Sequence, residues 1–386
     1  MSLSDRKLRM GMIGGGVGAF IGAVHRLAAN LDGQIELVCG AFSSDPEKSK
    51  KTGKELYLAP SRVYGSFKEM IETEAELPEG ERMDFVSIVT PNHVHAEPAI
   101  MALEHGFPVI IDKPLCFDMD EAKAIQAKVK ETGVPLALTH TYTGYPMIKE
   151  ARQQIRSGKF GKIRKILVEY PQGWLAEKVE DTENKQASWR TDPKRSGKSG
   201  AYGDIGTHAA NMAEYVSGLE VVKVLSQLKN VVPGRLLDDD ASAFLEFEGG
   251  VPGVLTVSQV AAGEENAIKV RVYGETGGIM WSQRDPNTLN LMWNDKPDEV
   301  WRTGTAYVSE AAQANSRTPA GHPEGYLEAF ANIYRNFAMH LRAIDSGEEH
   351  DVDIYDYPNV DEGVHGMALV DAVVRSTEEG NVWTEV

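Results

Sequence analysis

Two side chains suited to acid–base chemistry lie four positions apart in the middle of the sequence. Asp204 and His208 follow a glycine-containing stretch and precede residues 209–217, whose pattern is typical of a helix. Residues four apart share one face of a helix, with Cβ atoms about 5–6 Å apart, so an aspartate there can orient an imidazole and stabilise its protonated form. A surface Asp–His pair on a solvated helix would have the same spacing.

A lysine is the third candidate for chemistry. Lys113 follows residues 109–112, an apolar segment that predicts a buried strand. A lysine at a strand end is most often only solvated, but beside a nicotinamide ring an ammonium can polarise a substrate oxygen. Hydride transfer from an alcohol requires that the hydroxyl proton leave as the hydride does. Lys113, Asp204 and His208 together would supply that function.

A glycine-rich turn near the N-terminus is expected to hold the dinucleotide. Gly14 and Gly16 fit the first two glycines of the G-x-G-x-x-G fingerprint, and its third position is Ala19, which the fingerprint tolerates. Gly22 is the alternative packing glycine, and residues 17–20 are then extra to the turn. Glycine allows the tight turn and the close approach of backbone to a pyrophosphate at a helix N-terminus.

Further strand ends are expected at the same site. Strands are predicted over residues 34–42, 62–64, 84–90, 109–112 and 136–140 after the first one, mostly with helical patterns between them. Six βα repeats predict a doubly wound parallel sheet, whose ligands bind outside the carboxyl ends of the strands. The second of these ends is Ser43-Ser44, with Lys48 close behind. Because no acidic residue stands there to bind the ribose hydroxyls, both NAD and NADP are permitted.

The pattern changes after residue 140. Residues 162–171 alternate apolar and polar side chains, and strands are predicted at 221–228, 241–248, 254–260, 267–273, 279–282 and 289–293. Such a run of strands predicts a second, α+β domain built on a largely antiparallel sheet. Two late helices, 324–345 and 361–379, are expected to pack across it. The predicted domains are therefore residues 1–140, a Rossmann dinucleotide-binding domain, and residues 141–386.

Composition limits the partners. The chain has 386 residues and a formal net charge of −17, which disfavours nucleic acid and anionic membranes because both need clustered Lys and Arg. Two cysteines, Cys39 and Cys116, make no disulfide framework, and no Cys/His cluster has zinc-ligand spacing, so no metal is expected. Without an apolar segment of about 20 residues or a signal-like start, a cytoplasmic location is expected.

The ordered combination of these motifs resembles the glucose–fructose oxidoreductase, inositol dehydrogenase and MocA (Gfo/Idh/MocA) family. It comprises the glycine turn, the segment 90–95 (TPNHVH), Asp112-Lys113-Pro114 in place of the usual Glu-Lys-Pro, and Trp189-Arg190 followed by residues 203–208 (GDIGTH). The resemblance spans nearly the whole chain. It implies an NAD(P)-dependent dehydrogenase that oxidises a secondary hydroxyl of a sugar, glycoside or cyclitol. The second domain would bind the substrate, and its large open sheet would join homodimers or homotetramers.

The resemblance also implies roles for single residues. His208 is expected to act as general base, Lys113 to polarise the reacting oxygen, and Asp204 to orient the histidine. The expected cofactor contacts are Gly14, Gly16, Val17, Ser43, Ser44, Lys48, Thr90, Pro91, Asn92, His95, Asp112 and Lys113.

One segment departs from the family pattern. Many members carry an Asn-Tyr-Arg-type segment after the sixth strand, whereas this chain has residues 141–146 (TYTGYP), so the substrate class stays open. Its tyrosines can offer aromatic faces and hydroxyls to a sugar, or pack in a core at the domain junction. Arg190 can likewise form a salt bridge that fixes the loop before Gly200. The expected substrate contacts are Tyr142, Tyr145, Trp174, Trp189, Arg190, Asp204, His208 and His322.

Two other functions are compatible with these motifs. One is a redox-neutral glycosidase or lyase, in which a tightly held NAD transiently oxidises the sugar so that a neighbouring bond can be eliminated. The other is a non-catalytic sensor of a sugar or dinucleotide on the same fold. Lys113, Asp204 and His208 together favour an enzyme, because a sensor has no need of all three.

Overall fold

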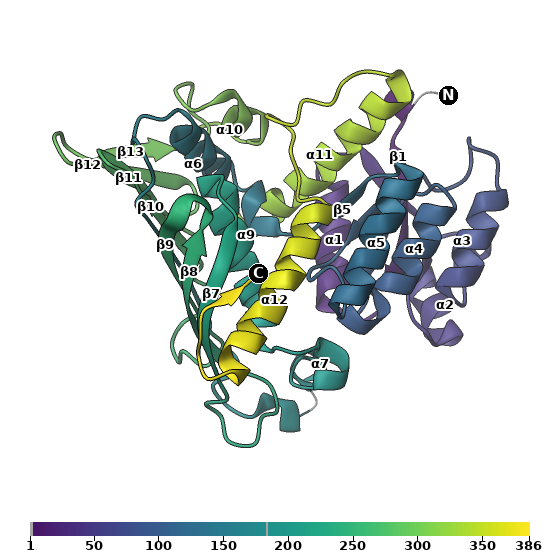
Figure 1. Ribbon diagram of the computed structural model, residues 1–386. Helices are drawn as coiled ribbons and strands as arrows, with labels where there is room; N and C mark the ends of the chain where they lie inside the picture. The colour runs from purple at the N-terminus through teal and green to yellow at the C-terminus, as the bar shows by residue number, and fades with distance from the viewer. Residues whose placement is uncertain (1–2, 183) are drawn as a thin grey trace. The chain divides into compact units, whose positions relative to one another are not determined.

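The computed structural model describes residues 3–182 and 184–386, and the chain divides into two compact units (Figure 1). The first unit runs to Thr139 and includes Leu327–Val364; the second consists of His140–Tyr326 and His365–Val386. The break after Thr139 lies one residue from the predicted boundary. Leu327–Val364, which the sequence analysis placed in the second domain, belongs to the first unit instead.

The first unit contains a five-stranded sheet in the order β2-β1-β3-β4-β5, and every strand pair in it is parallel. The strand order reverses at β1, which confirms the doubly wound sheet. Because all the strands are parallel, their carboxyl ends lie on one edge of the sheet. Its strands are β1 (Leu8–Gly14), β2 (Ile35–Ala41), β3 (Phe85–Val89), β4 (Val109–Ile111) and β5 (Leu136–Leu138). The strand expected at residues 62–64 is wrong, because a 3-10 turn from Pro60 to Arg62 leaves only a single bridge between Val63 and Gly40.

Helices connect these strands, and one more comes from far along the chain. The helices of this unit are α1 (Phe20–Asn30), α2 (Pro46–Glu55), α3 (Phe67–Glu76), α4 (Ala96–Glu104), α5 (Met119–Thr132) and α11 (Tyr326–Ser346). The expectation that α11 packs across the second sheet is wrong. Its buried face meets β3 and α1 instead: the ring centroids of Phe337 and Phe85 are 5.9 Å apart, and the Tyr334 hydroxyl lies 2.7 Å from His25 Nδ1.

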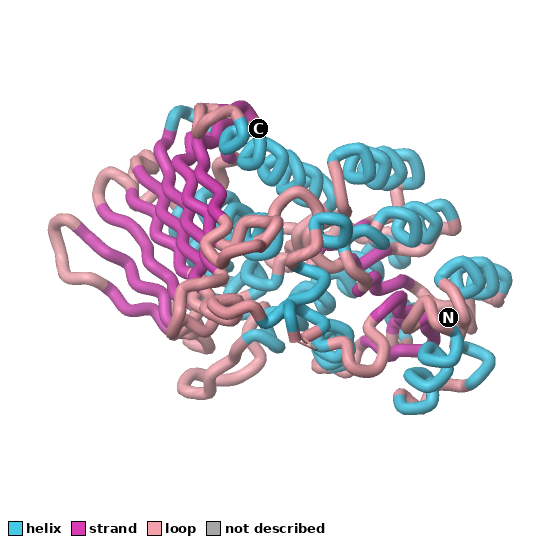
Figure 2. Tube along the Cα trace, turned by 90° about the horizontal axis from the view of Figure 1, so that it is seen from below, coloured by secondary structure: helices cyan, strands magenta, loops and turns pink. Residues whose placement is uncertain are grey.

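The second unit is built on a nine-stranded sheet in the order β13-β12-β11-β10-β6-β9-β8-β7-β14 (Figure 2). All its pairs are antiparallel except β6 with β9, which confirms the mostly antiparallel sheet. Its strands are β6 (Lys165–Pro171), β7 (Val221–Lys229), β8 (Asp240–Phe247), β9 (Val251–Ser258), β10 (Lys269–Tyr273), β11 (Gly277–Ser282), β12 (Thr288–Trp293), β13 (Glu299–Arg302) and β14 (Thr384–Glu385).

Helices cover one face of this sheet and leave the other open. Along β8, Ala241, Ala243 and Leu245 are buried while the alternate residue Phe244 is 57% exposed. The remaining helices are α6 (Pro146–Arg156), α7 (Lys185–Arg190), α8 (Pro193–Ser196), α9 (Thr207–Ser217), α10 (Glu310–Ala314) and α12 (Val360–Glu378). The C-terminal part of α12 lies along β7, where Ser226 Oγ donates to the Val373 carbonyl at 2.6 Å, as expected for the last helix.

Within the described part of the chain, no helix is both long enough and apolar enough to cross a bilayer.

Candidate active site

The glycine turn after β1 forms a cradle in which Gly14 and Gly16 have no room for a side chain. Gly14 has φ +85°, a conformation that L side chains rarely adopt, and a Cβ there would lie 2.9 Å from the Thr90 side chain. A Cβ on Gly16 would lie 2.8 Å from the Phe42 carbonyl oxygen. Helix α1 starts directly beyond, at Phe20, with Ala19 at its N-cap. An exposed backbone that leads into a helix N-terminus fits the pyrophosphate of a dinucleotide.

Gly22 is the glycine that lets α1 pack on this turn, as the alternative interpretation of the sequence proposed. A Cβ on Gly22 would lie 2.3 Å from Gly15 Cα and 2.7 Å from its carbonyl oxygen, and both are backbone atoms. The extra turn residues are Val17 to Ala19, because Phe20 is already helical.

We expect Gly22→Ala to lower the free energy of unfolding by about 1–3 kcal/mol, because the added methyl group forces the helix away from the turn. Urea unfolding measures the loss. Gly366→Ala on α12 is the matched control, since a Cβ there meets no atom within 4 Å. Equal stability of the two variants would contradict the close packing at Gly22.

The end of β2 offers hydroxyl groups and a cation. Ser43 Oγ accepts from the Asp45 N–H at 3.2 Å, and Asp45 caps α2 by accepting from the Glu47 and Lys48 backbone N–H groups. Ser44 and Lys48 are exposed. The Val17 N–H donates to Thr52 Oγ1 at 3.2 Å, which ties the glycine turn to α2. These predicted cofactor residues therefore lie next to the turn, and none of them is acidic.

The ends of β3 and β4 are joined by His95. Its Nε2 lies 2.8 Å from the Thr90 carbonyl oxygen and its Nδ1 lies 3.0 Å from that of Pro114. The side chain is fully buried, and burial lowers its pKa. The direct cofactor contact expected for His95 stays a prediction. His95 fixes the two strand ends, including Pro91 and Asn92, that border the cradle.

Asp112 supports the loop that carries Lys113. Its Oδ1 accepts from the Lys113 backbone N–H at 2.9 Å and from Thr139 Oγ1 at 2.8 Å. Burial alone would raise the pKa of the Asp112 carboxyl, but His25 and Lys113 outweigh it and lower that pKa well below the usual range. The carboxylate stays charged, and it holds the backbone of Lys113 at the edge of the sheet.

In the second unit, Asp204 and His208 lie on one continuous helix that contains a π turn. Residues Tyr202–Gly206 are π-helical, with the Thr207 N–H bonded to the Tyr202 carbonyl, and α9 continues from Thr207. Such turns are rare and occur often at functional sites. The helix start is held by Asp238, whose carboxylate accepts from the Gly200 N–H at 2.7 Å and the Tyr202 N–H at 2.9 Å.

Asp204 belongs to a polar group with Arg190 and Gln259. Its Oδ2 accepts from Arg190 Nε at 3.2 Å and from Gln259 Nε2 at 2.8 Å. The Arg190 guanidinium lies over the Trp189 ring at 4.3 Å and over the Trp174 ring at 6.0 Å. The salt bridge considered for Arg190 is therefore present, and it ties both predicted tryptophans to Asp204.

His208 is surrounded by other rings. The Tyr142 ring meets it edge to face at 4.9 Å, the Tyr170 ring lies 6.5 Å away, and His140 Nδ1 lies 3.4 Å from His208 Nδ1. Both histidines are buried. Tyr145 stacks parallel to Tyr142 at 6.3 Å.

Asn266 links these tyrosines to the tryptophan side of the site. Its Nδ2 donates to Tyr142 Oη at 3.0 Å, and its Oδ1 accepts from Tyr170 Oη and from Gln172 Nε2, each at 2.6 Å. Gln172 Oε1 in turn accepts from Trp174 Nε1 at 3.0 Å. Burial raises the pKa of Tyr142 and of Tyr170, so both hydroxyls stay protonated at neutral pH. The second unit thus brings seven of its eight predicted site residues into one connected cluster.

His322, the eighth, lies on an exposed loop where its Nδ1 is 3.3 Å from the Pro319 carbonyl oxygen, and its role in substrate binding stays a prediction.

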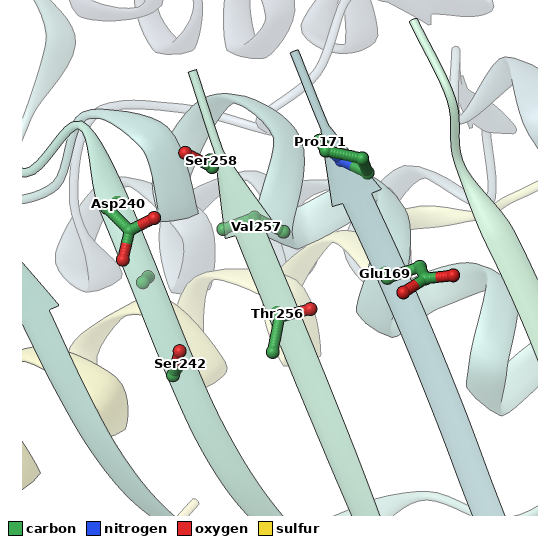
Figure 3. A pocket seen from close by; sticks show the side chains of 8 residues that line it. Glu169, Pro171, Asp240, Ser242, Thr256, Val257 and Ser258 are labelled. Carbon is green, nitrogen blue, oxygen red and sulfur yellow. The ribbon is translucent and has the colours of Figure 1, made fainter. Parts of the chain in front are cut away.

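A separate hollow lies on the sheet of the second unit (Figure 3). It is lined mainly by polar side chains of β6, β8 and β9, among them Glu169, Asp240 and Thr256. Thr256 alternates with Leu255 and Val257, which are buried on the helix-covered side, so Thr256 points to the open face. No residue predicted for catalysis lines this hollow.

Six residues of the described site were not predicted from the sequence: His140, Tyr170, Gln172, Asp238, Gln259 and Asn266. Asp238 was signalled by the run of three aspartates at 238–240, and His140 by its position at the end of the last parallel strand. Gln259 and Asn266 lie within or between strands of ordinary composition, and nothing in the sequence marks them.

Comparison with known proteins identifies the class. Residues 8–140 match the model of the oxidoreductase family with an NAD-binding Rossmann fold, and residues 148–280 match the GFO/IDH/MocA C-terminal domain. The uncharacterized oxidoreductase YfiI of Bacillus subtilis (strain 168) is 32% identical, and the match covers 99% of this chain and 97% of that protein. The chain therefore belongs to the Gfo/Idh/MocA family of oxidoreductases.

Two relatives have a named activity or ligand. A structure of an inositol dehydrogenase homolog from Azotobacter vinelandii, complexed with NAD+, is 33% identical with a TM-score of 0.94, covering 99% of this chain and 98% of that one. Levoglucosan dehydrogenase of Pseudarthrobacter phenanthrenivorans (strain DSM 18606 / JCM 16027 / LMG 23796 / Sphe3) is 28% identical over 79% of this chain and 81% of that protein.

Proposed function

We propose that this protein oxidises a secondary hydroxyl of a sugar, glycoside or cyclitol reversibly, with a nicotinamide dinucleotide as hydride acceptor and His208 as general base. The observation that carries the proposal is the cluster around His208. It holds a buried imidazole among tyrosine hydroxyls, amides and the Asp204 carboxylate, which are the groups that bind and deprotonate a polyol.

The first unit would hold the dinucleotide. The glycine turn fits its pyrophosphate, because its backbone leads directly into the N-terminus of α1. The bound cofactor supplies the hydride acceptor. Lys113 is proposed to polarise the reacting oxygen, and Asp112 to hold the lysine backbone in place.

His208 is proposed to take the hydroxyl proton and Asp204 to help orient the substrate and the imidazole. Thr139, which bonds to Asp112 beside Lys113, and His140, which contacts His208, are consecutive residues. The relatives named as inositol dehydrogenase homolog and levoglucosan dehydrogenase support a cyclitol or sugar as substrate.

A substrate panel tests this function. Purified protein is mixed with NAD+ or NADP+ and with monosaccharides, glycosides and cyclitols, and the absorbance of the reduced nicotinamide is followed. We expect at least one polyol to be oxidised. Intact cofactor binding without turnover across the panel would contradict the proposal, and release of an aglycone without net reduced cofactor would identify the redox-neutral glycosidase or lyase.

We also propose which dinucleotide the protein uses and how its chains assemble. Ser43, Ser44 and Lys48 permit the phosphate of NADP, while the family model and the NAD+ complex of the Azotobacter vinelandii homolog favour NAD.

We expect a homodimer or homotetramer formed through the open sheet face, on which Phe244 is 57% exposed. Light scattering of the purified protein would measure the mass.

A further inference from the structure

A second histidine lies against the proposed general base and is not a member of the Lys113, Asp204 and His208 group. His140 is only 3% exposed and follows β5, and its Nδ1 lies 3.4 Å from His208 Nδ1. The two rings meet edge to face, with centroids 5.3 Å apart and an interplanar angle of 81°. In this arrangement each ring directs the same nitrogen toward the other.

The backbone of His140 is fixed by a short turn. Its carbonyl oxygen accepts from the Thr143 N–H at 3.2 Å and from Thr143 Oγ1 at 3.0 Å, at the start of the 3-10 turn Thr141–Gly144. The Tyr142 ring from the same turn meets His208 edge to face, and its hydroxyl is held by Asn266. The His208 ring is therefore bordered by the His140 ring and by the Tyr142 ring, and the bond between the two Nδ1 atoms is the observation on which the inference rests.

When two ring nitrogens face each other, the protonation state of one determines that of the other. Two lone pairs repel at this distance, so one Nδ1 must carry a hydrogen and donate it to the other. If His208 Nδ1 donates, the lone pair of that ring is on Nε2, where it can accept a substrate proton. If His140 Nδ1 donates, the proton of a neutral His208 is on Nε2, and that ring cannot act as a base there.

We infer that His140 is a positioning residue that keeps His208 in the tautomer with its proton on Nδ1, an inference that rests on the proposed function of His208. When Nε2 takes the hydroxyl proton, the resulting imidazolium still donates from Nδ1 to His140, now as a charge-assisted hydrogen bond. His140 would thus stabilise the charged form without introducing a carboxylate. Loss of the hydrogen-bond partner that orients a metal-binding histidine lowers metal affinity or activity by about ten- to a hundredfold, and we expect an effect of the same order here.

Three variants and one spectrum test this. His140→Asn keeps an acceptor oxygen near the place of Nδ1, whereas His140→Leu removes it. We expect His140→Leu to lower kcat about ten- to a hundredfold with little change in the KM of the cofactor. His140→Asn should retain most of the wild-type kcat. His105→Asn is the matched control, since that exposed ring contacts only the Met101 carbonyl among its described hydrogen bonds. Leu and Asn with equal activity would overturn the inference.

Nitrogen-15 NMR of the imidazoles gives a reading that needs no substrate. We expect the wild-type spectrum to show the Nδ1–H tautomer of His208, and the His140→Leu spectrum to show its Nε2–H tautomer gain population. An Nε2–H tautomer in the wild type, or the same tautomer ratio in both proteins, would overturn the inference. If no polyol is oxidised but the tautomer ratio of His208 changes in His140→Leu, the proposed function is wrong while the inferred effect of His140 on His208 holds.

Discussion

His208→Ala is expected to lower kcat by about 10²- to 10⁴-fold, the usual contribution of a positioned general base. The imidazole is buried between His140, Tyr142 and Tyr170, and in our proposal it takes the substrate proton as the hydride leaves. Affinity for the dinucleotide should change little, because the glycine cradle belongs to the first unit. Steady-state kinetics with the best polyol of the panel, together with a cofactor titration, measures both quantities.

The matched control for His208→Ala is Ser217→Ala, at the last position of the same helix α9. It tests whether any small change in this helix lowers turnover, and we expect near wild-type kinetics. Wild-type turnover in His208→Ala would remove the residue from the mechanism. Loss of turnover accompanied by lost cofactor binding or unfolding would show that the side chain serves the fold instead.

Local patterns in the sequence were sufficient to predict the parallel sheet and the edge at which its strands end. Gly14 and Gly22 are marked by their type, since Gly14 has a positive φ and Gly22 lies so close to Gly15 that a Cβ on it would be 2.3 Å from the Gly15 Cα. The sequence placed helix α11 in the wrong unit. Its amphipathic pattern shows that one face of the helix is buried, but it does not show which element covers that face. Its partner is found only in the tertiary contacts of Tyr334 and Phe337.

The same distinction applies to the site. Asp204 and His208 could be placed on one helix from the sequence, because that assignment depends only on the local pattern of residues. His140 could not be placed next to His208, since 68 residues separate the two and only the folded second unit brings the two rings together. Asn266 is a similar case, an amide that gains its role by bonding Tyr142 across 124 positions.

Asp238→Ala is expected to lower the free energy of unfolding by at least about 3 kcal/mol, because three donors lose their acceptor at about 1–3 kcal/mol each. The donors are Ser199 Oγ at 2.8 Å, the Gly200 N–H at 2.7 Å and the Tyr202 N–H at 2.9 Å. Burial raises the pKa of the Asp238 carboxyl, and its three hydrogen bonds act in the opposite direction. Urea unfolding measures the stability, and hydrogen exchange of the Gly200 and Tyr202 amides reports the local opening.

Two further substitutions separate the role of Asp238 from that of a generic buried carboxylate. Asp238→Asn retains the shape and one acceptor oxygen but turns an NH₂ group toward one of the donors, so we expect a loss between those of wild type and Asp238→Ala. Asp240→Asn, in the same aspartate run but lining the hollow on the open sheet face, should leave stability unchanged. Because Asp238 anchors the helix that carries Asp204 and His208, its loss should also lower kcat. Full activity in a destabilised Asp238→Ala would show that the position of His208 does not depend on this anchor.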